Sequence, residues 1–318
     1  MSGETQYSRR AIGRLAAGAL AAAGMASLPG QASAAPHYRA HGPLLTDGYQ
    51  TWIDAINNQG ADLAKVVTGW GMPGPGPWQN FPDHIWTAAG ATNFLIVRTV
   101  TGDTDKMIDP NQAVAEIRDS RFFEFKKIRS GADKCIIELG NEPNIRVADP
   151  WTYGYNLSVT IDRIRETFPG AKICGTALSP NKTTNPDTWY GNPNFVDAIK
   201  KCDFVGVHFY SNADDGNFAA QGGWNELTYA ETLSRCASKW PGKPVIATEY
   251  SMRTTRLTPY QKGYKYGNFL HFDDSVATSL WGACYYHVQT NPGGIDFHEN
   301  VGSEGARGYR KRLSEGGL

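Results

Sequence analysis

The chain has 318 residues, and its 31 basic side chains are balanced by 31 acidic ones. Without the first 34 residues, which hold three Arg and one Glu, the balance is 28 against 30, so no positive field is present that would attract nucleic acid or anionic lipid. With 41% hydrophobic residues the chain can build one large core. A single barrel is the economical interpretation, since such barrels take about 250 residues.

The first 34 residues are expected to be an export signal and not part of the fold. Arg9 and Arg10 precede an Ala-, Gly- and Leu-rich stretch over 15–28, and Ala32-Ser33-Ala34 offers a small-residue cleavage site. A membrane anchor is the alternative, but the apolar stretch is short and poor in large side chains. We therefore expect a twin-arginine signal in 1–34, one folded domain in 35–318, and a periplasmic or secreted protein without membrane association once the signal is removed.

Strand-like apolar runs alternate with helical stretches in the rest of the chain, which is typical of βαβ units and a parallel sheet. Strands are expected at 66–71, 93–100, 134–141, 172–178, 203–210, 244–250 and 279–287. Helices are expected at 48–60, 111–129, 151–168, 225–239 and 258–270, with room for a closing helix in 305–318. The predicted fold is α/β, a single (β/α)8 TIM barrel, and its eighth strand lies either in 37–47 or between 100 and 134.

Two of the expected strands deliver a glutamate. The run from Cys135 leads to Glu142, and the run from Pro244 leads to Glu249. Both runs are short and apolar, as expected for strands covered on both faces, and each acid comes where the strand gives way to a loop. This is the end of the strands where barrel enzymes hold their chemistry, so the two glutamates are candidates for a pair of catalytic carboxylates.

Three further motifs accompany the glutamates in chain order. Arg98 lies near the end of the strand at 93–100, Asn141 begins the sequence Asn-Glu-Pro, and His208 and Tyr210 share one face of the strand at 203–210. In this order and spacing, over most of the mature chain, the sequence resembles the clan A glycoside hydrolases, which are retaining (β/α)8-barrel enzymes, and families 5 and 39 in particular.

The resemblance implies that Glu142 is the acid/base on the fourth strand and Glu249 the nucleophile on the seventh. A fourth-strand acid/base favours 37–47 as the place of the missing strand. Cleaving a glycosidic bond needs one carboxylic acid to protonate the leaving oxygen and one carboxylate to attack. The charge of Glu249 is expected to keep Glu142 protonated until Glu249 is esterified, after which Glu142 acts as the base.

The other motif residues are expected to support the two acids. Arg98 and Tyr210 would hydrogen-bond Glu249 and keep it ionised, Asn141 would bind the 2-hydroxyl of the sugar, and His208 would orient this network or contact the sugar. The expected activity is hydrolysis of the β-glycosidic bonds of a poly- or oligosaccharide by double displacement. No motif calls for a metal or another cofactor, and a monomer is expected.

Sugar sites also need aromatic platforms, because the faces of pyranose rings are apolar. Trp70, at the end of its strand beside a Gly- and Pro-rich loop, is one candidate. Trp281 matches the final-strand tryptophan of the clan, but it comes early in its strand. Tyr286 or His287, nearer the end of that strand, would then take its place.

Two groups of residues have a structural interpretation. Glu138 lies one pleat deeper than Glu142, and a buried ion pair with Arg98 as the candidate partner is expected for it. The five cysteines are an odd number without zinc spacing, so buried free thiols are expected, with a Cys174–Cys202 disulfide as the open alternative.

Two other functions remain open at this point. A transglycosylase would use the same catalytic pair and differ only in how well an acceptor sugar competes with water. A non-catalytic carbohydrate-binding barrel would keep the architecture without turnover, but it would have no need of both acids and of their supporting residues.

Overall fold

The computed structural model describes residues 39–45, 49–68, 83–211, 226–252, 257–270, 279–285 and 304–315. All of them belong to the unit Tyr38–Leu318. The expected export signal in 1–34 and the expected platforms Trp70 and Tyr286 lie outside the described residues. None of the helices in the described ranges is long and apolar enough to cross a bilayer.

Eight parallel strands form the centre of the described part of the chain. They are β1 (Ala40–Pro43), β2 (Leu63–Val67), β3 (Phe94–Arg98), β4 (Cys135–Glu138), β5 (Lys172–Cys174), β6 (Val205–Ser211), β7 (Val245–Met252) and β8 (Leu280–Tyr285). They pair in the orders β1-β8-β7-β6 and β2-β3-β4-β5. Parallel bridges between Leu44 and Lys65 and between Cys174 and Phe204 join the two sheets. The strands follow one another around a ring in chain order, so the (β/α)8 barrel is confirmed, and β1 is the strand expected within 37–47.

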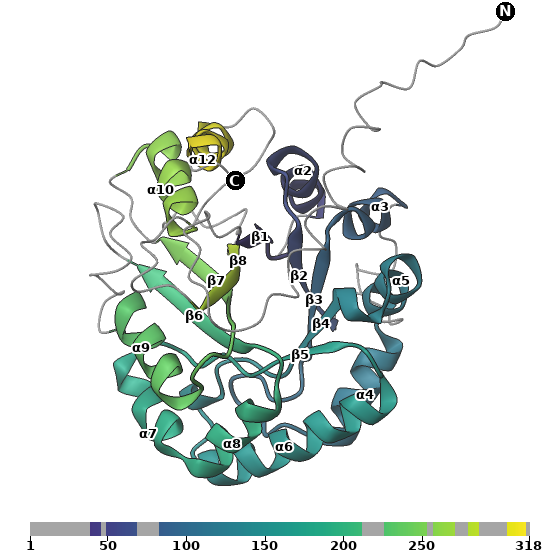
Figure 1. Ribbon diagram of the computed structural model, residues 1–318, viewed down its shortest axis with the longest axis vertical. Helices are drawn as coiled ribbons and strands as arrows, with labels where there is room; N and C mark the ends of the chain where they lie inside the picture. The colour runs from purple at the N-terminus through teal and green to yellow at the C-terminus, as the bar shows by residue number, and fades with distance from the viewer. Residues whose placement is uncertain are drawn as a thin grey trace, which may run out of the picture. The chain divides into compact units, whose positions relative to one another are not determined.

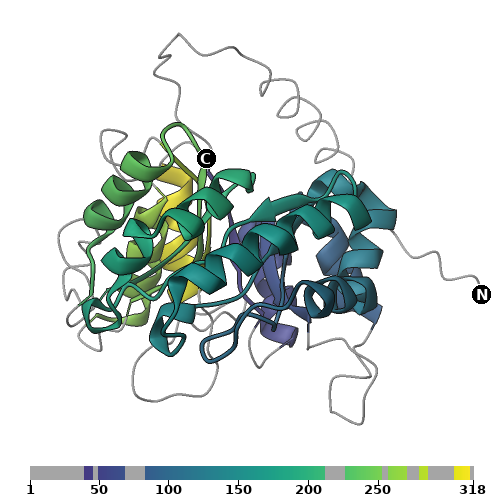
Figure 2. The ribbon, with the colours of Figure 1, turned by 90° about the horizontal axis from the view of Figure 1, so that it is seen from below.

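Helices lie outside the strands, as Figure 1 shows. They are α2 (Tyr49–Gln59), α3 (Asp83–Ala91), α4 (Pro110–Asp119), α5 (Arg121–Ser130), α6 (Pro150–Thr167), α7 (Pro186–Gly191), α8 (Pro193–Lys201), α9 (Tyr229–Lys239), α10 (Pro259–Phe269) and α12 (Glu304–Glu315). Short 3₁₀ turns are η5 (Ala132–Lys134), η6 (Pro143–Ile145) and η7 (Lys182–Thr184). In Figure 2, which views the molecule from below, the teal helices of the α6 to α8 region lie in front of the strands.

Local capping chemistry sets where the helices begin. Asp149 accepts hydrogen bonds from the first backbone amides of α6, and Thr258 forms a capping box at the start of α10, each followed by a proline that has no amide hydrogen to satisfy. The single helix expected at 111–129 is wrong. Ser120 has an extended backbone that ends α4, and its side chain caps α5 by accepting a hydrogen bond from the Phe123 amide.

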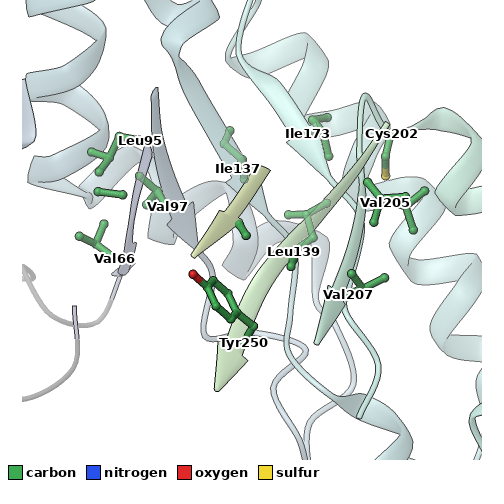
Figure 3. Close-up of a cluster of buried hydrophobic side chains, with 14 of the residues drawn as sticks. Val66, Leu95, Val97, Ile137, Leu139, Ile173, Cys202, Val205, Val207 and Tyr250 are labelled. Atoms are coloured by element: carbon green, nitrogen blue, oxygen red, sulfur yellow. The ribbon is translucent and has the colours of Figure 1, made fainter. Parts of the chain in front are cut away.

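Alternation along the strands divides the apolar side chains between two cores. Leu95 and Val97 point toward the helices and belong to the larger core, part of which Figure 3 shows. Ile96, between them, belongs to a smaller core inside the barrel. The inner core consists of Ala40, Leu63, Phe94, Ile96, Ile136, Cys174, Phe204, Ile246 and Cys284, with Trp281 packed against it. Most of these residues come from the first half of their strand, so the inner core fills the amino end of the barrel.

The five cysteines are buried free thiols. Cys174 lies in β5, but Cys202 ends α8 and does not lie in a neighbouring strand. The alternative of a Cys174–Cys202 disulfide is therefore wrong.

Candidate active site

Glu142 follows β4 on a sharply turned backbone. Gly140 has a φ of 74°, and a Cβ there would collide with the Tyr153 hydroxyl and the Gly102 carbonyl, so this position needs glycine. Glu142 has a φ of 45°, a left-handed conformation that costs on the order of 1–3 kcal/mol in a non-glycine residue. A hydrogen bond from its amide to the Ala177 carbonyl, 2.9 Å long, holds the turn in place. The strained backbone of Glu142 is thus at the residue whose carboxylate has to point in one direction.

A β-bulge aims Glu249. Val207 of β6 pairs with Ala247 and His208 pairs with Glu249, which leaves Thr248 as the extra residue of β7. With strict alternation, Ala247 and Glu249 would both face the helices. The bulge instead turns Glu249 toward His208, while Tyr250 packs on Phe269 with ring centroids 4.2 Å apart.

His208 lies between the two glutamates. Its Nδ1 is 2.7 Å from Glu142 Oε1, and its Nε2 is 3.8 Å from Glu249 Oε1. The imidazole is buried, and burial opposes its protonation. The negative charge of Glu249 and the hydrogen bond to Glu142 outweigh burial and raise the pKa of His208. The short contact with Glu142 fixes the orientation of the imidazole, and both roles expected for His208 stay predictions.

Tyr210 connects the same two carboxylates. Its hydroxyl donates a 2.8 Å hydrogen bond to Glu249 Oε2 and lies 3.5 Å from Glu142 Oε1. The two carboxylate oxygens are thus separated by no more than the sum of 2.8 and 3.5 Å. Retaining glycosidases hold their carboxyl groups about 5–5.5 Å apart and inverting ones about 6.5–9.5 Å apart. The bound set by Tyr210 applies to this pair of oxygens, and it is compatible with the spacing of a retaining pair.

Glu249 is ionised over a wide pH range. Its burial raises the pKa, but the charges of His208, Lys65 and Arg98 and the Tyr210 hydrogen bond act in the opposite direction and lower the pKa of Glu249 to about 2. A carboxylate that stays negative at neutral pH is what a nucleophile requires.

Arg98 acts on Glu249 at a distance only. The expected hydrogen bond between them is absent from the described residues, and the nearest acid to Arg98 is Asp103, with 3.5 Å between Nη1 and Oδ1. The ion pair turns the guanidinium toward the loop after β3. The positive charge of Arg98 still contributes to the low pKa of Glu249.

Asn141 is held by the same aspartate. Its Nδ2 donates a 3.1 Å hydrogen bond to Asp103 Oδ1, while its own Oδ1 is buried and has no hydrogen-bond partner among the described residues. Asp103 therefore connects Arg98 with Asn141. Asp103 was not among the residues predicted from the sequence. Its one signal is an acid that closely follows a strand-end arginine.

Lys65 and Glu138 form a buried ion pair beneath the site. The Lys65 ammonium lies 2.7 Å from Glu138 Oε2 and 3.3 Å from Glu249 Oε1, and the side chains of Lys65 and Glu138 have no exposed surface. The partner of Glu138 is thus Lys65, and the expected pair with Arg98 is wrong. Lys65 was missed because the strand was expected at 66–71, whereas β2 spans Leu63–Val67. A lysine inside an apolar strand run was the available signal.

Trp281 does not reach Glu142 and Glu249. Its ring packs on Phe94 and Phe204, with centroids 5.0 and 4.9 Å apart, in the inner core at the amino end of the barrel. A register shift between β7 and β8 puts an extra residue at Trp281, because Val245 pairs with Leu280 and Ile246 pairs with Gly282. The tryptophan fills the end of the barrel opposite Glu142 and Glu249.

Comparison with known proteins gives likeness in structure only. No family model and no curated protein matches the chain. A family 39 glycoside hydrolase from Bacteroides cellulosilyticus WH2 matches over 81% of this chain and 59% of its own, at 15% identity and a TM-score of 0.51.

Two other solved structures have a similar likeness. An exo-beta-1,4-mannosidase from Opitutaceae bacterium strain TAV5 covers 90% of this chain and 63% of its own, at 13% identity and a TM-score of 0.53. A broad-specificity endoglucanase from Clostridium longisporum covers 86% of both chains, at 12% identity and a TM-score of 0.53. The chain thus spans less than two thirds of the length of the family 39 enzyme and of the mannosidase. At such identities the likeness concerns the fold alone, and it confirms the (β/α)8 barrel.

Proposed function

We propose that this protein is a retaining glycoside hydrolase that cleaves β-glycosidic bonds of a poly- or oligosaccharide, with Glu249 as the nucleophile and Glu142 as the acid/base. The observation that carries the proposal is the position of the Tyr210 hydroxyl, which is within 3.5 Å of an oxygen of each carboxylate. Two carboxylates that share one hydroxyl in this way suit direct attack by one of them on a sugar whose leaving oxygen the other protonates, the arrangement of a retaining enzyme.

In the first step Glu249 attacks the anomeric carbon. A bond forms between that carbon and a carboxylate oxygen, and the glycosidic bond breaks with its electron pair on the leaving oxygen. Glu142 donates a proton to this oxygen. The short contact between His208 and Glu142 keeps a proton at hand for this transfer. Tyr210 holds the Glu249 carboxylate in one orientation while it attacks.

In the second step water replaces the enzyme at the anomeric carbon. Glu142, now ionised, removes a proton from the water, and the ester bond to Glu249 breaks to regenerate the carboxylate. Glu142 thus serves as acid in the first step and as base in the second. Lys65 and His208 are placed to stabilise the returning negative charge of Glu249.

The likeness to a family 39 glycoside hydrolase, an exo-beta-1,4-mannosidase and an endoglucanase supports a carbohydrate substrate. Asn141 supplies the candidate contact to the sugar. Its Oδ1 has no hydrogen-bond partner within the described ranges, so it is free to accept a hydrogen bond from a sugar hydroxyl. We assign this contact to the 2-hydroxyl, where a bond strengthens in the transition state.

We also propose that the protein is exported by the twin-arginine route, which the sequence Ser8-Arg9-Arg10 and the cleavage site at Ala32-Ser33-Ala34 support. Expression in a bacterial host should place the folded protein in the periplasm with a new amino terminus near Ala35. Changing Arg9 and Arg10 to Lys should leave it in the cytoplasm. Export of this variant at the original rate would contradict the assignment.

The hydrolase proposal is tested by a screen of the purified protein against β-linked polysaccharides and aryl β-glycosides, with released reducing ends as the measure. Glu249→Ala is the matched control. Activity that disappears in this variant supports the proposal and identifies the substrate. Binding of a glycan without turnover by the wild type would favour the non-catalytic barrel, and products longer than the substrate would show transglycosylation.

A further inference from the structure

A lysine that neutralises the nucleophile presents a difficulty for a double displacement. Lys65 lies 3.3 Å from Glu249 Oε1 in the barrel interior, where neither it nor Glu138 has exposed surface. An isolated ammonium in such a place is costly, because no water replaces the lost partner. When Glu249 becomes a neutral ester, the attraction between Glu249 and Lys65 is lost. A lysine with Glu249 as its sole partner would therefore oppose formation of the glycosyl-enzyme.

Glu138 removes this difficulty by its position. Glu138 Oε2 lies 2.7 Å from the Lys65 ammonium, closer than Glu249 does. Among the described residues Lys65 is the one cation within 4 Å of Glu138, and neither Glu138 oxygen has a hydrogen-bond partner there. Arg98, the other buried cation nearby, pairs with Asp103. Glu138 thus neutralises Lys65 directly and acts on Arg98 only at a distance.

We propose that Lys65 and Glu138 are positioning residues that balance the charge of the nucleophile through both steps of the reaction, with Lys65 shared between Glu138 and Glu249 in the free enzyme and paired with Glu138 alone in the glycosyl-enzyme. The inference rests on the proposed function. It concerns how the two steps are balanced, which the assignment of the catalytic pair does not determine.

The two members of the pair act in opposite directions on the two steps. Lys65 stabilises the ionised carboxylate, so it makes Glu249 a weaker nucleophile and a better leaving group. Glu138 takes part of the ammonium charge away from Glu249. In Glu138→Gln the whole charge of Lys65 acts on Glu249, which slows formation of the ester and favours its breakdown. In Lys65→Met the carboxylate loses its cation, which slows breakdown of the ester.

The pH dependence follows the same logic. In the described part of the chain, the charged and titratable side chains around Glu249 come from β2, β3, β4, β6 and β8. They are Lys65, Arg98, Glu138, Glu142 after β4, His208, Tyr210 and Cys284. Removing the Lys65 cation takes away one of the charges that lower the pKa of Glu249. Loss of that charge raises the pKa, so the acid limb of kcat/KM should move to higher pH in Lys65→Met.

The experiment measures the two steps separately on an aryl β-glycoside that the wild type cleaves, with the pre-steady-state burst of the released phenol for the first step and the steady-state rate for the second. We expect Glu138→Gln to lower kcat/KM by about tenfold or more, the factor that one pKa unit represents, and to show no burst. Lys65→Met should lower kcat by a similar factor and show a burst that approaches one equivalent of enzyme. Lys65→Arg, which keeps the charge, should recover most of kcat.

A double variant covers the case in which a single variant does not fold. Lys65→Met with Glu138→Gln leaves no buried charge unpaired, and it should share the burst and the low kcat of Lys65→Met. Equal losses of kcat and kcat/KM in the variants, with an unchanged burst, would mean that the pair only supports the fold and would overturn the inference. A wild type without activity on any glycoside would instead overturn the proposed function, and the inference with it.

Discussion

The two ends of the barrel interior are built by the same strands from opposite kinds of side chain. At the amino end the strands contribute Leu63, Ile96, Ile136 and Ile246 to the inner apolar core. Two or three residues further along the same strands stand Lys65, Arg98, Glu138 and Glu249. In β2, β3, β4 and β7, the inward-facing residue that follows the apolar one is therefore charged.

The difference between the two ends separates stability from chemistry. Burial of apolar surface at the amino end contributes about 25 cal/mol per Å². Burial of Lys65, Glu138 and Glu249 at the other end costs desolvation free energy that pairing only partly returns. Trp281, turned to the amino end by a bulge, increases the apolar part. Substitutions at the two ends should therefore affect different quantities.

The largest effect on activity is expected for Glu249→Ala. Loss of the nucleophile should lower kcat by about 10⁴-fold or more, since a covalent step can no longer occur. Azide should restore part of the activity and give a product of inverted configuration, because it attacks from the side that Glu249 occupied. Wild-type activity in this variant, measured as release of phenol from an aryl glycoside, would exclude Glu249 as the nucleophile.

Glu142→Ala should have an effect that depends on the leaving group. A general acid contributes roughly 10²–10⁴-fold, and a substrate whose leaving group needs little protonation loses less in the first step. We expect the ratio of wild-type to variant kcat/KM to fall as the pKa of the leaving phenol falls. An equal ratio across a series of aryl glycosides would contradict the acid/base role.

Tyr210→Phe should have a smaller effect. It removes the 2.8 Å hydrogen bond to Glu249 without changing the shape of the ring. A hydrogen bond to a charged group contributes about 1.5–3 kcal/mol, which corresponds to a loss of about 10- to 150-fold in kcat/KM. Thermal unfolding should show that the variant is folded. A loss as large as that in Glu249→Ala would mean that Tyr210 has a catalytic role of its own.

Ile246→Ala should have the smallest effect on activity and a large one on stability. Ile246 lies three residues before Glu249 in β7, fully buried in the inner core. Its truncation should lower the free energy of unfolding by about 2–5 kcal/mol. The folded variant should keep kcat within about twofold, because its catalytic groups keep their contacts. Denaturant unfolding and kcat measured below the transition test this contrast with Glu249→Ala.

Much of the fold and the two acids could be predicted from the sequence because they depend on local patterns. Apolar runs between helical stretches predicted the barrel, and strand-end glutamates predicted Glu142 and Glu249. The bulge at Thr248 that aims Glu249 is invisible in the sequence, since strict alternation would turn this residue toward the helices. Glu249 was predicted from its position at the end of the strand. The face of the strand on which it lies could not be predicted.

Contacts across the barrel could not be predicted. Lys65 and Glu249 are 184 positions apart in the chain and meet only because β2 and β7 face the same interior. Lys65 lies one residue before the strand expected at 66–71, so the local pattern did not place it inside the barrel. Asp103 likewise acquires its role only where the loop after β3 meets Asn141.

The most direct test of the proposed double displacement is the configuration of the first product. Proton NMR of a hydrolysis reaction, recorded before mutarotation proceeds, distinguishes the β from the α anomer of the released sugar. The closeness of Glu142 and Glu249 to one tyrosine hydroxyl predicts the β anomer, with retained configuration. The α anomer as the first product would contradict a covalent intermediate on Glu249.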